Sequence, residues 1–148
     1  MKSNNSVTFE FNLRAISVNK LYVNIPGQSR RFKSTEGKNF TKAVEASLAE
    51  QLTPEQRAIL DSWTTAKLSV EMVFIQPDWL TKKGMARRCD VENLSKGTSD
   101  SIISGLEAVD ILLDDSQYFE VTVKKAYGES PKIIYTISEI PEWSTEKS

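Results

Sequence analysis

Apolar and polar residues alternate in four short segments of the chain. The segments are 7–13 (VTFEFNL), 67–75 (KLSVEMVFI), 119–124 (FEVTVK) and 133–138 (IIYTIS). Because successive side chains of a strand point to opposite faces, this pattern is typical of strands with one buried face. We expect the last two strands to pair as a hairpin through the turn at 128–131.

Helical spacing occupies the intervals between these strands. Residues 37–51 carry apolar side chains about every fourth position, which predicts an amphipathic helix. The tetrapeptide 53–56 (TPEQ) combines a capping threonine, a proline at the first helical position and a glutamine that completes a capping box. It predicts a second, short helix that ends near Trp63. After Asn93 the apolar residues again share one helical face, as far as Val109.

The remaining segments are polar. Residues 17–34 are expected to form an irregular connection, and residues 78–88 a flexible loop that leads to Asp90. The tail after Pro141 is expected to fray. The order β-α-α-β-α-β-β predicts an α/β (α+β) fold, with a mixed sheet of about four strands and helices mainly on one face. The length fits one domain, residues 1–148.

Composition narrows the possible chemistry. The chain has one cysteine, Cys89, and no histidine. These counts exclude an internal disulfide, a four-cysteine zinc site and any triad or dyad that uses histidine. No apolar run is long enough to cross a membrane, and residues 1–11 lack the apolar core of a signal peptide. We therefore expect a cytoplasmic protein without a membrane partner.

The net charge is −1, but the charges are unevenly distributed. Residues 12–44 contain seven basic residues and one acidic residue, and a second basic group precedes Asp90. Such segregation favours either a basic face for a DNA backbone or simply a solvated loop, and charge alone leaves both open. The candidates for DNA contact are Arg30, Arg31, Lys33, Lys82, Lys83, Arg87 and Arg88.

An acidic stretch, residues 89–117, carries the candidate chemistry. Asp90 and Glu92 lie at positions i and i+2, which point the same way in extended backbone. If the chain folds back after the following helix, Asp115 returns a third carboxylate to them. Such oxygen ligands favour Mg²⁺ or Mn²⁺. Lys96 lies one helical turn after Glu92, where its ammonium can contact a scissile phosphate.

The same residues also have purely structural interpretations. Asp90 and Glu92 can serve as helix N-terminal acids, which the helix dipole favours. Lys96 and Asp100 can form a surface pair, and Asp114 with Asp115 can form a turn. Spacing alone does not decide between these interpretations and a metal site.

Several motifs, taken together, resemble the RusA-type Holliday-junction resolvases. Residues 90–96 (DVENLSK), followed by Asp100 and by 114–117 (DDSQ), are similar to that family's D-x-D-N-L-x-K, Asp and D-D-x-Q. Residues 17–22 (SVNKLY) resemble its S-x-N-x-x-Y segment. The stretch from Arg31 to Phe40 and the final strand, 135–140, resemble the corresponding family segments. Two departures are Glu92, where the family commonly has Asp, and a longer segment between Lys96 and Asp114.

The resemblance implies a small homodimeric α/β endonuclease that uses Mg²⁺ to cut four-way DNA symmetrically in recombination and DNA repair. By position, Asp90, Glu92 and Asp115 would hold the metal, and Lys96 would be the catalytic lysine. For Asp100, helix stabilisation and support of the site both remain open. The longer Glu92 motivates an alternative, a branched-DNA-binding protein with weak or no cutting. Proteins that resemble the RusA family are frequent in phages and prophages, so the resemblance is compatible with a phage-like origin. The net charge also leaves open an interaction protein without a DNA role.

Overall fold

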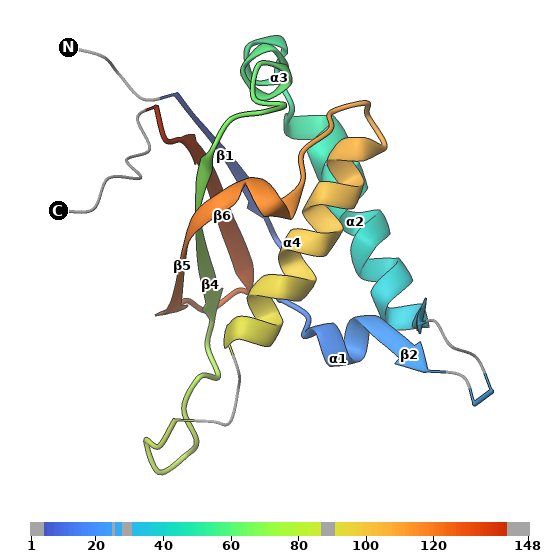
Figure 1. The fold of residues 1–148 in the computed structure, drawn as a ribbon. Coiled ribbons are helices and arrows are strands. Elements are labelled where there is room, and N and C mark those ends of the chain that lie inside the picture. The colour runs from blue at the N-terminus through green and yellow to red at the C-terminus, as the bar shows by residue number, and fades with distance from the viewer. Residues whose placement is uncertain (1–4, 25, 28–30, 87–90, 142–148) are drawn as a thin grey trace, which may run out of the picture.

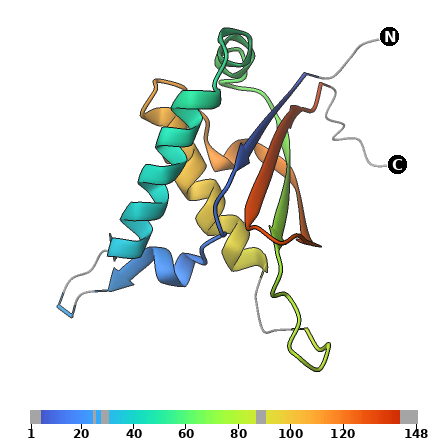
Figure 2. The same cartoon turned by 180° about the vertical axis from the view of Figure 1, so that it is seen from behind.

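The computed structural model describes residues 5–24, 26–27, 31–86 and 91–141. A four-stranded mixed sheet packs against a helical layer on one of its faces (Figures 1 and 2). The strands are β1 (Ser6–Phe11), β4 (Leu68–Gln76), β5 (Tyr118–Tyr127) and β6 (Lys132–Glu139), and the two long helices are α2 (Thr35–Gln51) and α4 (Val91–Glu107). The expected fold class and the order of the main elements are confirmed.

The predicted alternation produces the core. Every second residue of β1, β4 and β6 is buried, from Val7 to Phe11, from Leu68 to Gln76 and from Ile133 to Ile137. Leu48 of α2 and Ile102 of α4 are also fully buried. Gly105 allows α2 and α4 to approach closely, because a Cβ there would press on the Leu48 side chain.

The expected hairpin between the last two strands is wrong. The sheet order is β1-β6-β4-β5, so β4 lies between β5 and β6. β6 runs antiparallel to both β1 and β4, whereas β5 runs parallel to β4. β4 suits the inner position because its second face is partly buried along its whole length, while most residues of β5 are exposed. The partly covered second face of β4 fits an inner strand, and this order depends on pairing between segments distant in sequence, which a turn between neighbours cannot reveal.

The described residues within 17–34 are more ordered than the irregular connection we expected. They include a one-turn helix, α1 (Val18–Leu21), and a small hairpin of β2 (Tyr22–Asn24) and β3 (Arg31–Lys33). Ser34 caps α2 by accepting from the Gly37 amide, and it also donates to the carbonyl of Lys20. A Cβ at Gly37 would overlap the Leu21 carbonyl. This close approach fixes Tyr22 and Lys33 beside the helical layer.

The other connections follow local signals. The predicted short helix is α3 (Pro54–Asp61), and Thr53 and Gln56 form the expected capping box. The described part of the expected flexible loop, residues 78–86, is an organised turn. The Thr81 amide donates to the Met85 carbonyl over 2.7 Å, and Gly84 adopts a positive φ of 80°. Among the described residues, no helix is long and apolar enough to span a membrane.

Candidate active site

One face of α4 carries the candidate polar residues. Glu92, Lys96 and Asp100 follow one another at intervals of four, so they lie along the same face of the helix. Glu92 and Lys96 are exposed, whereas Asp100 is half-buried. Because a helix rises about 1.5 Å per residue, Glu92 lies about 12 Å from Asp100 along the helix axis. The face is thus acidic at both ends, with the lysine between them.

Asp100 lies at the centre of a charged cluster. Burial raises the pKa of its carboxyl group above the ordinary value, and the nearby charge of Asp115 raises it further. The positive charge of Lys96, a hydrogen bond with Tyr22 and the charge of Lys33 act in the opposite direction. The fold therefore brings Asp115 and Lys96 to Asp100, together with two residues of the β2–β3 hairpin.

Asp115 is held by a short, tightly bonded turn. The 3-10 helix η1 (Asp115–Gln117) directly precedes β5 and returns the chain towards α4 (Figure 1). Asp114 caps it, and the Ser116 amide is the main cause that lowers the pKa of the Asp114 carboxyl group. The Gln117 side chain accepts from the Asp114 amide over 2.9 Å. The same side chain donates to the carbonyls of Trp63 and Ala66 over 2.7 and 3.0 Å.

An open cleft of about 370 Å³ lies at this cluster. Its wall combines four carboxyl groups with three other side chains, namely Asp100, Glu107, Asp114 and Asp115 with Tyr22, Ile103 and Ser104. The cleft is thus strongly acidic, and the only basic groups found to act on its half-buried Asp100, within the described residues, are Lys96 and Lys33. This surplus of negative charge suits a bound cation.

The donor set fits a hard divalent cation. Asp100 and Asp115 both line the cleft and offer carboxylate oxygens, which Mg²⁺ prefers, and a cation bound in the cleft would offset the repulsion between their charges. Within the described residues, no group of three or more Asp, Glu, Cys or His side chains is arranged to hold a metal ion. Asp90, the first predicted ligand, lies outside the described residues, so the three-carboxylate set with Glu92 and Asp115 stays a prediction.

A buried hydroxyl network lies behind the acidic cluster. The Tyr135 hydroxyl forms hydrogen bonds with the hydroxyls of Tyr118 at 2.7 Å and Ser99 at 3.0 Å. Burial is the main cause that raises the pKa of Tyr135 to about 12 and that of Tyr118 well above its ordinary value. Tyr118 is only half-buried as a residue, but its hydroxyl is enclosed. The network joins α4, β5 and β6 beneath the residues that form the cleft.

Two of the basic segments lie at the end of the molecule where α4 begins. The turn that carries Lys82 and Lys83 and the β2–β3 hairpin with Lys33 both approach this end (Figures 1 and 2). Lys82 and Lys83 are exposed. Arg31 lies in β3, whereas Arg30, Arg87 and Arg88 lie outside the described residues.

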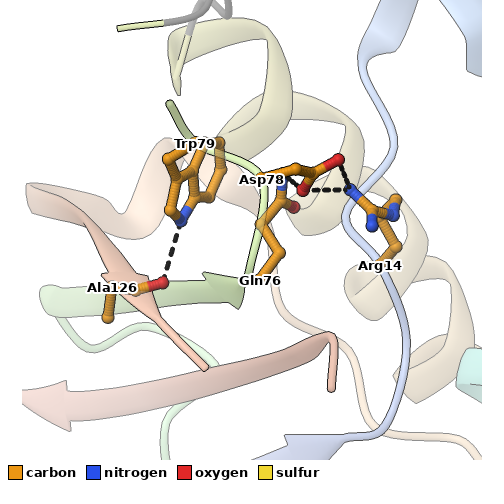
Figure 3. A network of polar contacts seen from close by, with 5 residues as sticks. All are labelled: Arg14, Gln76, Asp78, Trp79 and Ala126. Carbon is orange, nitrogen blue, oxygen red and sulfur yellow. Dashed lines mark hydrogen bonds and ion pairs between the residues drawn. The ribbon is translucent and has the colours of Figure 1, made fainter. Parts of the chain in front are cut away.

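Figure 3 shows how the start of this turn is fixed. Asp78 accepts from Arg14 over 2.9 and 3.2 Å and from Gln76 over 3.1 Å. The Trp79 indole donates to the carbonyl of Ala126 over 2.8 Å, and the Lys125 ammonium lies 4.9 Å from the Trp79 ring centre. These contacts hold the end of β4 on both sides, at the point where the chain leaves the sheet and continues towards Asp90.

Comparison with known proteins decides the family. The family model described as endodeoxyribonuclease RusA matches residues 15–138, most of the chain. The chain belongs to the RusA family. RusA-family membership supports the general activity of an endonuclease that resolves Holliday junctions, and these nucleases generally depend on a divalent metal. No curated protein matches the sequence.

The RusA motifs contain two site residues whose roles the sequence did not reveal. Gln117 is the last residue of the D-D-x-Q motif, but its partners Trp63 and Ala66 precede it by about fifty residues. Tyr22 closes the S-x-N-x-x-Y segment and lies beside Asp100. Their presence in the motifs was the available sign that they have a role. The contacts themselves join segments that are distant in sequence, so the sequence could not show them.

Proposed function

We propose that this chain is a Mg²⁺-dependent endodeoxyribonuclease that resolves Holliday junctions or other branched DNA by symmetric phosphodiester hydrolysis, as a homodimer. The observation that carries the proposal is the cleft that Asp100 and Asp115 line in a RusA-family chain, with the charge of Lys96 acting on Asp100. A junction needs two matching cuts, and a two-fold dimer provides two equivalent sites. Mn²⁺ can replace Mg²⁺, because both accept hard oxygen ligands.

In the proposed site, Asp90, Glu92 and Asp115 hold the cation, and Asp100 adds negative charge beside Asp115. When bound, Mg²⁺ activates water and neutralises charge on the phosphate. Lys96 extends from the helix face between Glu92 and Asp100, where its ammonium contacts the scissile phosphate and stabilises the developing charge. Tyr22 orients the Asp100 carboxyl group through their hydrogen bond.

The proposed binding of DNA uses the basic residues at the α4 end of the molecule. Lys33, Lys82 and Lys83, together with Arg30, Arg31, Arg87 and Arg88, would contact the phosphate backbone. These contacts offset the repulsion between DNA and the acidic cleft, and they orient a strand towards Lys96.

The test is cleavage of a synthetic four-way junction. Wild type with Mg²⁺ is expected to cut two strands at symmetric positions, while Asp90→Asn, Asp115→Asn and wild type in EDTA are expected to cut at least about 100-fold more slowly. Asp61→Asn, an exposed acid on α3, is the matched control and should cut normally. Equal cutting by Asp90→Asn, or by wild type in EDTA, would refute the mechanism.

One observation favours a second candidate function, a branched-DNA-binding protein with weak or no cutting. Glu92 replaces the family's common Asp, and it lies two helical turns from Asp100 rather than beside it. Junction binding without cleavage in both Mg²⁺ and Mn²⁺ would establish this function. Recovery of cutting in Glu92→Asp would then identify the longer side chain as the cause.

A further inference from the structure

β5 forms one edge of the sheet and exposes large apolar side chains. The exposed fractions are 42% for Phe119, 52% for Val121 and 74% for Tyr127. At the edge of a sheet, half of a strand's backbone N–H and C=O groups point away from its single neighbour. β5 is the longest strand and contains no proline or glycine. A long edge strand with exposed apolar side chains can pair with another strand.

The opposite edge, β1, is protected against such pairing. All three of its large apolar residues are buried, and its exposed residues are polar. The Gln51 side chain also forms two hydrogen bonds with the backbone of Glu10. It accepts from the Glu10 amide over 3.0 Å and donates to the Glu10 carbonyl over 2.9 Å. On β5, a side chain likewise bonds to the backbone near the end of the strand, where the Trp79 indole donates to the Ala126 carbonyl. The middle of β5 is therefore the accessible edge.

The charges of β5 indicate which strand it pairs with. Glu120 and Lys124 carry opposite charges at equal distances, two residues on either side of Thr122. We propose that β5 pairs antiparallel with β5 of a second copy, with the two-fold axis at Thr122. This proposal rests on the homodimer of the proposed function and identifies its interface. Glu120 then lies opposite the partner's Lys124, and Val121 lies opposite the partner's Val123.

The side chains match on both faces of the proposed pair of β5 strands. Val121 and Val123 are in register with Val70 and Met72 of β4, so they lie on the helix-bearing face. Thr122 and Lys124 are in register with Glu71 and Val73, on the other face. Charged residues usually prevent edge pairing, but here antiparallel self-pairing places opposite charges together. A parallel, in-register pair would instead place Glu120 against the partner's Glu120.

The arrangement has a consequence for the two active sites. The two four-stranded sheets join into one sheet, and the two-fold axis perpendicular to it puts both helical layers on the same face. Asp115 directly precedes β5, and antiparallel pairing places the two β5 starts about 26 Å apart along the strand direction. Both acidic clefts are thus available to one branched substrate.

The experiment is a charge-exchange series measured by sedimentation velocity. Wild type is expected to sediment as two 16.7 kDa chains. Glu120→Lys places lysine opposite lysine twice, so the dimer dissociation constant should rise about tenfold or more. Lys124→Glu should do the same, although it also removes the 2.8 Å ion pair with Glu71. The double variant Glu120→Lys/Lys124→Glu should restore the homodimer, and an equimolar mixture of the single variants should form a heterodimer.

Glu50→Lys is the matched control, because it makes the same charge change at an exposed position on α2, which packs against α4 and β1. Its dissociation constant should equal that of wild type. A monomeric wild type, both alone and bound to a junction, would overturn the inferred interface. So would a dimer that Glu120→Lys weakens no more than Glu50→Lys does. Junction cleavage, assayed separately, reports on the proposed function: a working charge-exchange series without cleavage retains the interface and rejects the nuclease.

Discussion

The side-chain amide of Gln117 donates to the backbone carbonyl of Trp63 over 2.7 Å. This bond connects the turn that carries Asp115 to the segment between α3 and β4. Gln117 also accepts from the Asp114 amide, so one side chain both shapes the turn and fixes its position. The position of Asp115 in the wall of the cleft therefore depends on how this turn is held.

Gln117→Ala should therefore reduce junction cleavage by more than its loss of folding stability can explain. Loss of its hydrogen bonds leaves the carbonyls of Trp63 and Ala66 without this partner, at a cost of about 1–3 kcal/mol in the free energy of unfolding. Junction cleavage should fall about tenfold or more, because the Asp115 carboxylate is no longer positioned. Chemical denaturation and a cleavage time course measure the two effects.

Gln51→Ala is the matched control for Gln117→Ala. Gln51 likewise bridges two segments, α2 and β1, through its side-chain amide, but it lies away from the cleft. It should lose similar stability and keep its cleavage rate. Equal loss of cleavage in both variants would mean that Gln117 acts only through stability.

Asp115→Asn should abolish stabilisation by Mg²⁺. In wild type, a cation relieves the repulsion between Asp115 and Asp100, so Mg²⁺ at about 100 times its dissociation constant should stabilise the fold by about 2–3 kcal/mol. In EDTA the variant should be at least as stable as wild type, because one of the two repelling charges is gone. Thermal unfolding with and without Mg²⁺ measures both effects, and Asp61→Asn should behave like wild type.

Replacing Lys82 and Lys83 with alanine should weaken junction binding in a salt-dependent manner. If each lysine contacts one phosphate, the slope of log affinity against log salt should become shallower by up to about two. Lys67→Ala, at an exposed lysine at the opposite end of β4 from the turn, is the control and should leave the slope unchanged. Fluorescence anisotropy at several salt concentrations gives the slopes, and an unchanged slope in the double variant would remove these lysines from the interface.

Alkaline pH should destabilise the fold through Tyr135. Burial raises the native pKa of Tyr135 to about 12, whereas the pKa of a tyrosine in an unfolded chain is about 10. Between these values the unfolded chain binds fewer protons than the native protein, so the free energy of unfolding falls as pH rises from about 10 to about 12. Stability should be insensitive to this group below that range.

Tyr135→Phe should make this decline shallower, while Tyr127→Phe, at an exposed position, should leave it unchanged. Phenylalanine also removes the hydrogen bonds to Ser99 and Tyr118, which should cost about 1 kcal/mol near neutral pH. Denaturant unfolding at a series of pH values separates the constant cost from the change in slope. An identical slope in wild type and Tyr135→Phe would show that this phenol does not control alkaline stability.

Local pattern accounts for much of the fold. Alternation located β1, β4, β5 and β6 to within a few residues, because a strand with one buried face requires that period. The spacing of apolar residues and the Thr53–Gln56 capping box located α2, α3 and α4, but not the one-turn α1. The motifs around Asp90 and Asp114 pointed to the family that the comparison then confirmed. These signals depend on residues that are near one another in sequence.

The sequence by itself thus determined the type and order of the main elements and the family. Only the tertiary structure decided which strands pair: β4 lies between β5 and β6, with one face buried and the other partly buried. It also decided that Asp100 meets Asp115 and Tyr22, and that Gln117 reaches Trp63. Each of these contacts joins segments whose separation along the chain leaves no local period or turn signal. They form only when the sheet and the helical layer pack together and exclude water.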